Sequence, residues 1–409
     1  MKFLSHQKFM IFKKDQKRIF LDYASITPVD KRVVAKMEQV QKMTFANPSA
    51  LYTEALVAKD LVREAREKIA KIIHSGKKEV IFTSGGTEGN NLALLGLFEK
   101  SRTKSFKPHI ITTIIEHPAI IEVCKEIERR GGEVTYLPVS PSGLVSPQDI
   151  RRALKNNTVL VSVSYANNEI GTIQPIKEIG RIVKEWRSRS AKATQDKQKN
   201  NTNFPYFHTD ACQAGLYLSL DVLKLGVDLM TLDGIKIYGP RSSGILYVKS
   251  GIDLSPVIYG GGQEGGLRSG TENVSSIVGL SLALEIAEKM REKESKRLFG
   301  LRDYAIKNIL GNFPKATLNG SGEFRLPNNI NICFPGMDAE FAVIHLDVLG
   351  ISTSYSSSCR TLKEDSSSYV VESLGKKNCS QSSLRFTLGR DSKKSDIDAL
   401  IIALKKIVL

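Results

Sequence analysis

The sequence lacks any long apolar run: none approaches the roughly 20 residues that a helix needs to cross a bilayer. Its first residues, MKFLSHQKFMIFKKDQKR, also lack a continuous apolar stretch followed by the small residues of a secretory cleavage site. We therefore expect no membrane segment and a cytoplasmic location.

Cysteine is scarce as well. The five cysteines are far apart, and none forms a CxxC or another metal-ligand spacing; they are Cys124, Cys212, Cys333, Cys359 and Cys379. Their odd number and wide spread predict free thiols in a reducing compartment and no metal site. All except Cys359 are interpreted as small buried hydrophobic residues.

Acidic residues are the minority charge, with 43 against 59 basic residues and a net charge of +16. This excess favours acidic partners such as tRNA, anionic proteins or phosphorylated ligands. Its densest parts are the N-terminal segment and KEWRSRSAKATQDKQK at residues 184–199, and neither interleaves aromatic residues with arginine in the way a stacking platform for bases would. We therefore do not expect nucleic acid as the main partner, and we interpret residues 188–203 as a flexible surface insertion.

The chain does contain an alternation of short β-branched runs with helical patterns, which predicts α/β architecture with a mostly parallel sheet. Strands are expected at residues 79–83, 109–114, 134–137, 158–163, 206–209, 228–232 and 244–248. The clearest helix is Val57 to Ile73, with apolar residues at helical spacing before Gly76 ends the run.

The pattern changes near residue 290 to a charged helix, a short strand at residues 330–334, a serine-rich loop and a final helix. With 409 residues the chain is long enough for two domains. We predict a large α/β domain at residues 29–290, which binds the ligand, and a small α+β domain at residues 291–409. The N-terminal segment, residues 1–28, is predicted to be part of the small domain.

Three local motifs could together form a ligand site. In IFTSGGTEGNN, the glycines before Thr87 present free backbone N–H groups at a helix start, which suits a phosphate, although such turns also serve packing alone. In HTDACQA, Asp210 follows a strand, where it could bind a ligand or cap a helix. In LDGIKIYGP, Lys236 follows the next strand, although most lysines are simply solvated.

Together these motifs match what pyridoxal phosphate needs: an anion cradle, a carboxylate for its ring nitrogen and an amine. The sequence also resembles the cysteine desulfurases of the NifS/IscS type, fold-type I pyridoxal phosphate enzymes of the class V aminotransferase group, from about Phe20 to the C-terminus. The resemblance rests on blocks in the family's order, among them LDYASITPVD, FTSGGTEGNNLAL, EHPAI, SYANNEIGTIQPI, HTDACQA, GIKIYGP, GGGQEGGLRSGTEN and SLRFTLGR.

The resemblance implies roles for the residues around the cofactor ring. Lys236 would bind the cofactor covalently and act as the base at the substrate Cα. Asp210 would pair with the pyridine nitrogen, and Gln213 would donate to the phenolic oxygen. His117, counted with the catalytic residues, would stack on the ring; otherwise it fills space at a helix start. Asn168 would meet the phenolic oxygen and the substrate carboxylate; otherwise it belongs to a turn.

Further roles concern the phosphate and the substrate. Gly86 and Thr87 would hold the phosphate, and Thr271 would reach the phosphate of a partner subunit's cofactor, which implies a homodimer. Arg385 would grip the substrate carboxylate, for which a bidentate guanidinium is well shaped; otherwise it is a surface arginine at a strand edge.

Cys359, in GISTSYSSSCR, stands where the family has its nucleophilic cysteine. A serine-rich loop packs poorly and could move between the site and an acceptor, and the adjacent Arg360 favours the thiolate. The implied reaction takes sulfur from L-cysteine, leaves L-alanine and places a persulfide on Cys359. A sulfur-acceptor protein, either an iron-sulfur scaffold or a tRNA thiolation enzyme, would then receive the sulfur.

One motif departs from the family pattern, because Asp233-Gly234-Ile235-Lys236 replaces the usual Ser-Gly-His-Lys. The family serine donates a hydrogen bond to the phosphate, whereas an ionised Asp233 would repel it. Two like charges about 4 Å apart repel by roughly 4 kcal/mol at an effective dielectric constant near 20. Three hypotheses therefore compete: a working desulfurase, a pyridoxal phosphate enzyme with another substrate such as a lyase or transaminase, and a weakened relative that serves as a scaffold or partner-binding protein.

Overall fold

The structure is a computed structural model that describes residues 18–193, 204–355 and 367–408, without the side chains of 190–193. A central seven-stranded sheet dominates it. In the order β2-β8-β7-β6-β5-β3-β4, its strands are β2 (Val80–Thr83), β3 (His109–Thr113), β4 (Glu133–Leu137), β5 (Thr158–Ser162), β6 (Tyr206–Asp210), β7 (Leu229–Asp233) and β8 (Gly244–Val248). Neighbouring strands from β4 to β7 are parallel, and β8 is antiparallel to both of its neighbours. The predicted mostly parallel α/β sheet is therefore confirmed.

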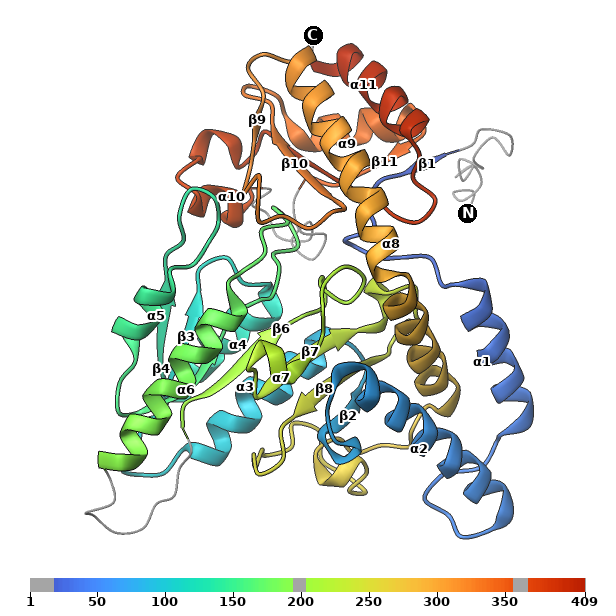
Figure 1. The fold of residues 1–409 in the computed structure, drawn as a ribbon, viewed down its shortest axis with the longest axis vertical. Coiled ribbons are helices and arrows are strands. Elements are labelled where there is room, and N and C mark those ends of the chain that lie inside the picture. Colours follow the sequence, from blue (N-terminus) through green and yellow to red (C-terminus); the bar gives the residue numbers. More distant parts are fainter. Residues whose placement is uncertain (1–17, 194–203, 356–366, 409) are drawn as a thin grey trace, which may run out of the picture.

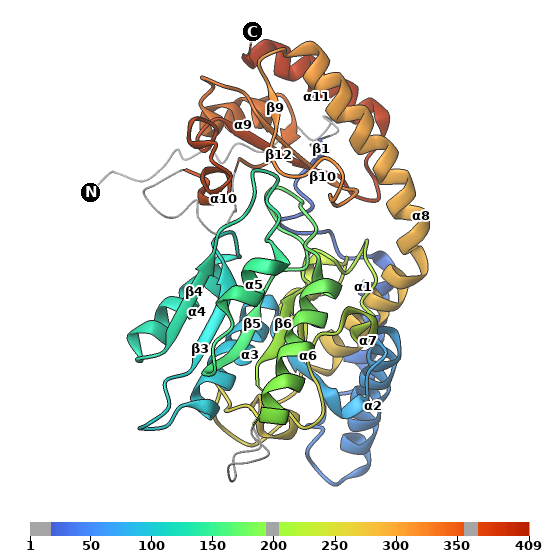
Figure 2. The ribbon, with the colours of Figure 1, turned by 60° about the vertical axis from the view of Figure 1, so that its left-hand side comes forward.

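Helices cover both faces of this sheet, as the alternation of side chains along its strands requires. Ile110 packs with apolar residues of α3 and α4, whereas the adjacent Ile111 packs with those of α6. The covering helices are α3 (Gly86–Ser101), α4 (Pro118–Arg129), α5 (Pro147–Ala153), α6 (Ile176–Ala193) and α7 (Val222–Leu225). Figure 2 shows α5 and α6 in front of the strands. Because α6 continues to Ala193, the stretch interpreted as an insertion from Ser188 begins as a helix.

A long helix, α8 (Val274–Asn312), connects the body around the sheet with the C-terminal elements (Figures 1 and 2). Helices α1 (Lys31–Met43) and α2 (Thr53–Ile73) pack against α8. The domain limit expected at residue 290 falls inside this continuous helix, so the division stays a prediction. Within the described ranges, no helix combines the length and the apolar character needed to cross a membrane.

Helix α2 shows where the periodicity argument was inexact. The helix starts four residues before the predicted Val57, and that side chain is 42% exposed. The helix packs against α8, and its buried residues are Ala55, Ala58, Val62, Ala65, Ile69, Ala70 and Ile73. The helix ends because His74 adopts a left-handed conformation with φ of 58°, before Gly76 is reached.

The C-terminal elements surround a three-stranded antiparallel sheet in the order β12-β10-β9. They are β9 (Thr317–Leu318), β10 (Asn329–Cys333), α9 (Ala339–Val348), β11 (Ile351–Ser352), α10 (Tyr369–Ser373), β12 (Ser383–Thr387) and α11 (Lys394–Val408). The first strand of the chain, β1 (Ile19–Phe20), pairs in parallel with β11. The start and the end of the described chain therefore lie together at the top of Figure 1.

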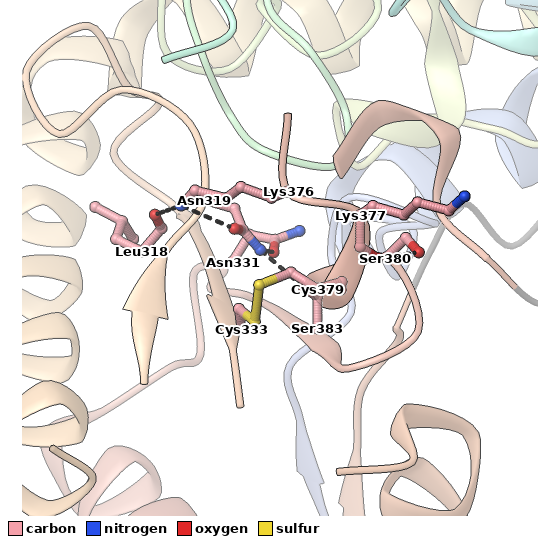
Figure 3. Close-up of a disulfide and its surroundings, with 9 residues drawn as sticks. All are labelled: Leu318, Asn319, Asn331, Cys333, Lys376, Lys377, Cys379, Ser380 and Ser383. Carbon is pink, nitrogen blue, oxygen red and sulfur yellow. Dashed lines mark hydrogen bonds between the residues drawn. A yellow bond between two sulfur atoms is a disulfide. The ribbon is translucent and has the colours of Figure 1, made fainter. Parts of the chain in front are cut away.

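A disulfide joins Cys333, at the end of β10, to Cys379 in the turn η4 (Lys377–Cys379), with the Cα atoms 5.4 Å apart (Figure 3). The expectation that every cysteine is a free thiol is wrong for this pair. The strand pairing places Cys333 opposite Ser383, whose hydroxyl donates to the Cys379 carbonyl at 2.6 Å. Tertiary contacts, not sequence spacing, therefore bring the sulfurs together. Cys124 is unbonded and buried, as expected.

Candidate active site

A cavity lies at the carboxyl ends of β5, β6 and β7, beside the first turn of α3. This is where ligands bind in open α/β sheets, because the loops that leave parallel strands diverge there. Its lining includes these predicted site residues: Gly86, Thr87, His117, Asn168, Asp210, Gln213, Lys236 and Arg385. The structure thus brings together side chains from most of the length of the chain.

Asp210 is the last residue of β6 and is 8% exposed. Its Oδ2 accepts a hydrogen bond from Asn90 Nδ2 at 2.7 Å, and its Oδ1 accepts one from the Cys212 N–H at 3.0 Å. Asp210 does not cap a helix through this bond, because Cys212 lies in a turn and not in a helix. Asn90, one turn along α3, was not predicted, although it belongs to the glycine motif.

Lys236 ends the short turn η2 (Gly234–Lys236) that follows β7 directly. Its Nζ donates to the carbonyls of Ala24 at 2.9 Å and Ser25 at 2.5 Å. Gln213 Nε2 also donates to the Ala24 carbonyl, at 3.0 Å. The stretch after β1 therefore closes one side of the cavity and orients the amine.

His117 is half-buried at the start of α4. Its Nδ1 accepts a hydrogen bond from the Ala119 N–H at 3.1 Å, so the ring caps the helix and lines the cavity at once. Burial lowers the pKa of His117, and the nearby Lys236 lowers it further, while Asp210 opposes both. The imidazole is therefore neutral near pH 7, with its Nε2 carrying the proton.

Asn168 is held at the cavity by a turn built on its neighbour. The side chain of Asn167 accepts hydrogen bonds from the N–H groups of Glu169 at 2.9 Å and Ile170 at 3.0 Å. Asn167 therefore forms the turn, and Asn168 lines the cavity; its contacts with a cofactor and a substrate stay a prediction.

The first N–H of α3 already has a partner. Asp233 Oδ2 accepts a hydrogen bond from the Gly86 N–H at 3.0 Å, and Asp233 Oδ1 accepts one from the Ile235 N–H, also at 3.0 Å. Burial raises the pKa of Asp233 above its ordinary value, and these backbone donors partly oppose that. Thr87, the next residue of α3, is exposed and lines the same cavity.

Arg385 is 1% exposed, so it is not a surface arginine. Its Nη2 donates to Asp22 Oδ1 and to Ser25 Oγ, both at 2.8 Å, and its Nη1 donates to the Asn168 carbonyl at 3.0 Å. Its Nε is buried without a partner among the described residues. Asp22, which orients this guanidinium, belongs to the LDYASITPVD block, and its role was not predicted from the sequence.

Two further predicted site residues are Thr271 and Cys359. Thr271 is exposed and does not line the cavity of its own chain. Cys359 lies outside the described residues. Their assigned roles stay predictions.

Comparison with known proteins agrees with this geometry. Residues 19–400 match the family model of class-V aminotransferases. Cysteine desulfurase IscS from Dictyoglomus turgidum is 40% identical over 394 residues, which is 96% of this chain and 95% of that protein. Among solved structures, a NifS-like protein is 32% identical, with a TM-score of 0.84 over 96% of this chain and 98% of that one.

A second solved structure, of SspA in complex with cysteine, is 33% identical, with a TM-score of 0.77 over 91% of this chain and 99% of that one. These similarities extend over both the sheet and the C-terminal elements. The chain is therefore a member of the class-V aminotransferase family and, within it, of the cysteine desulfurases, which are enzymes.

Proposed function

We propose that this protein uses pyridoxal phosphate to remove sulfur from L-cysteine, with L-alanine as the other product. The observation that carries the proposal is that the Lys236 amine and the Asp210 carboxylate line one cavity, together with the neutral ring of His117. Relatives named cysteine desulfurase favour this function over that of a lyase or transaminase.

The residues around the ring position fit the cofactor chemically. Lys236 would form the covalent link, Asp210 would hold the proton on the pyridine nitrogen, and His117 would lie against the ring face. Gln213 and Asn168 would face the phenolic oxygen. The buried Asn90 Oδ1 has no partner within the described chain, as expected for a polar wall that a ligand completes.

The remaining contacts concern the two anionic groups. Gly86 and Thr87, at the start of α3, would hold the phosphate, because N–H groups at a helix N-terminus attract anions. Arg385 would bind the carboxylate of cysteine through the N–H donors that its present partners do not use, Nε among them. Its Asp22 partner fixes the orientation of the guanidinium before the substrate arrives.

When bound, the cofactor supplies an electron sink for the charge that develops at the substrate Cα. Lys236 would take the Cα proton, and the carbonyls of Ala24 and Ser25 mark where its ammonium rests. Asp210, held by Asn90, would keep the ring nitrogen protonated. Arg385 would fix the substrate carboxylate and so orient the Cα–H bond towards Lys236.

Cys359 would accept the sulfur. Its thiolate attacks the sulfur of cysteine, so that a sulfur–sulfur bond forms while the carbon–sulfur bond breaks, and the Cβ left behind is protonated to give alanine. A persulfide remains on Cys359, and a sulfur-acceptor protein for iron-sulfur cluster assembly or tRNA thiolation would take its outer sulfur. This assignment rests on the sequence resemblance.

The protein would act as a homodimer in which Thr271 reaches the phosphate of the cofactor held by the partner subunit. Support comes from a segment with unusually exposed apolar side chains: Phe45 is 88% exposed and Leu51 is 90% exposed. Exposed apolar side chains gathered in one segment favour an interaction surface there.

The test combines absorption with product analysis. The full chain with added pyridoxal phosphate should show the visible absorption band of the lysine-bound cofactor, and Lys236→Ala should abolish it. Lys376→Ala is the matched control, because Lys376 Nζ also donates to a backbone carbonyl, that of Leu318 at 2.7 Å, but lies outside the cavity. Cys359→Ser should keep the band and lose sulfide release from cysteine.

Two results would contradict the proposal. A band that survives in Lys236→Ala would exclude this lysine as the attachment point. A Cys359→Ser variant with full sulfide release would exclude the persulfide route while leaving the cofactor assignment intact.

A further inference from the structure

The carboxylate of Asp233 occupies the anion-binding position at the start of α3. Oδ2 accepts the Gly86 N–H at 3.0 Å, and Oδ1 accepts the Ile235 N–H at the same distance. Asp233 also lines the cavity beside Lys236. The 16-residue helix thus directs its positive end at a carboxylate that belongs to the chain itself.

Gly85, just before this helix, and Gly86, its first residue, leave no spare room around that carboxylate. A Cβ atom on Gly86 would lie 3.3 Å from Asp233 Oδ2 and 2.7 Å from Cys212 Sγ, and one on Gly85 would lie 3.3 Å from the same oxygen. The carboxylate therefore fills the hollow that the glycines create. A phosphate that accepts the Gly86 N–H must first displace Asp233.

We propose that Asp233 is a built-in competitor of the cofactor's phosphate, which must be protonated or turn away from Gly86 before the phosphate can bind. The inference rests on the proposed use of pyridoxal phosphate and deepens it. Two consequences follow. The phosphate group contributes less to the binding free energy than it would beside an uncharged residue at position 233. This contribution also depends on pH.

The direction of the pH dependence follows from the charges around Asp233. Four titratable groups face it: Asp210 on β6, Cys212 in the turn after β6, Lys236 on η2 and His117 at the start of α4. Glu88 on α3 is already paired, with Arg268 Nε at 3.0 Å and the Ser84 N–H at 2.8 Å. Burial raises the pKa of Asp233, so a fall in pH neutralises it and favours the phosphate.

The experiment compares pyridoxal phosphate with pyridoxal, which lacks the phosphate. Both aldehydes need Lys236 and contact the same ring residues, so the ratio of their dissociation constants isolates the contribution of the phosphate. Binding is measured by absorption on the full chain after removal of bound aldehyde, for the native protein, Asp233→Ser and Asp233→Asn. Asp221→Asn is the control, because Asp221 accepts the Leu223 and Lys224 N–H groups at another helix start and does not line the cavity.

The preference for pyridoxal phosphate over pyridoxal should rise at least tenfold in both Asp233 variants and stay unchanged in Asp221→Asn. As the pH falls, the preference of the native chain should increase more than that of Asp233→Asn, in which residue 233 cannot take up a proton. Affinity for pyridoxal should be the same in the native chain and in Asp221→Asn, and pyridoxal binding by the two Asp233 variants reports that they fold correctly.

Three outcomes would overturn the inference. Equal preferences in native and variant chains would show that Asp233 does not compete, while the cofactor assignment would stand. Loss of pyridoxal binding in both variants would make Asp233 a structural residue. Binding of neither aldehyde by any of the four proteins would remove the proposed cofactor and this inference together.

Discussion

Arg385 and Asp22 form an ion pair, with Nη2 2.8 Å from Oδ1, and the arginine side chain is 2% exposed. The pair joins β12 to the stretch that follows β1, so a segment near the start of the described chain meets a C-terminal strand at the candidate active site. A buried guanidinium with a carboxylate on one side can present only its remaining donors to a ligand. The geometry of the pair therefore determines how a substrate carboxylate would approach.

Replacement of Arg385 should affect both substrate binding and stability. Arg385→Ala should raise the KM for cysteine at least tenfold and lower the free energy of unfolding by about 3 kcal/mol, because Asp22 loses its partner. Arg385→Lys should restore part of the stability but less of the binding, since a lysine cannot present a bidentate fork. Steady-state kinetics and urea unfolding measure the two effects.

Arg302→Ala is the matched control for that experiment. Arg302 is also 1% exposed and donates to the carbonyls of Arg325 and Leu326, away from the cavity. It should lose stability with KM unchanged. If Arg385→Ala likewise lost only stability, Arg385 would be a structural residue.

Glu116 should make the stability of the protein depend on pH. Burial raises the pKa of Glu116 to about 7, although the Ser164 N–H at 3.0 Å and the Thr113 hydroxyl at 2.6 Å donate to its carboxyl group. The unfolded chain releases this proton at lower pH than the folded chain. The contribution of Glu116 to stability is therefore present below about pH 4.5 and is lost as pH rises towards 7.

The Glu116→Gln variant isolates this effect. Between pH 5 and pH 8 its stability relative to the native protein should rise by about 3 kcal/mol, measured by urea unfolding. The comparison cancels the other buried groups, such as His208, whose pKa burial lowers to about 4. The exposed Glu178→Gln should show no such trend. A constant difference for Glu116→Gln across this range would mean that Glu116 titrates normally.

The disulfide between Cys333 and Cys379 should stabilise the fold. It closes a loop of 46 residues, for which loop-closure entropy predicts about 4 kcal/mol. Reduction should therefore lower the Tm of the native protein. Cys379→Ser should have a lower Tm than the oxidised native protein, and reductant should not change it further. Thiol counts on the denatured chain should rise by two upon reduction; a full count of five before reduction would contradict the bond.

The exposed segment around Leu51 should lie in the homodimer interface. Leu51→Glu and Phe45→Glu should shift the protein from dimer to monomer, because a charge buried at an interface is costly. Light scattering after size-exclusion chromatography measures the mass. Val348→Glu is the control, since Val348 is 76% exposed on α9 and should not affect the dimer. A native protein that is monomeric at micromolar concentration would refute the proposed dimer.

Local pattern was sufficient for the secondary structure of the central sheet. Each of its seven strands was predicted to within two residues at either end, because short apolar β-branched runs between turns have few other stable conformations. The local pattern did not predict features that depend on the packing of helices against each other. The change in composition near residue 290 does not interrupt α8, since charged residues are good helix formers. The buried face of α2 is chosen by its fit to α8.

The sequence by itself determined the α/β class, the motif that places Lys236 after a strand and the family to which the chain belongs. Only the tertiary structure decided which side chains meet. Asp22 and Arg385 are 363 residues apart, Gly86 and Asp233 are 147 apart, and Cys333 and Cys379 are 46 apart. Such pairs leave no periodic signal, because their proximity depends on how the strands are ordered in the sheet and on which helices cover them.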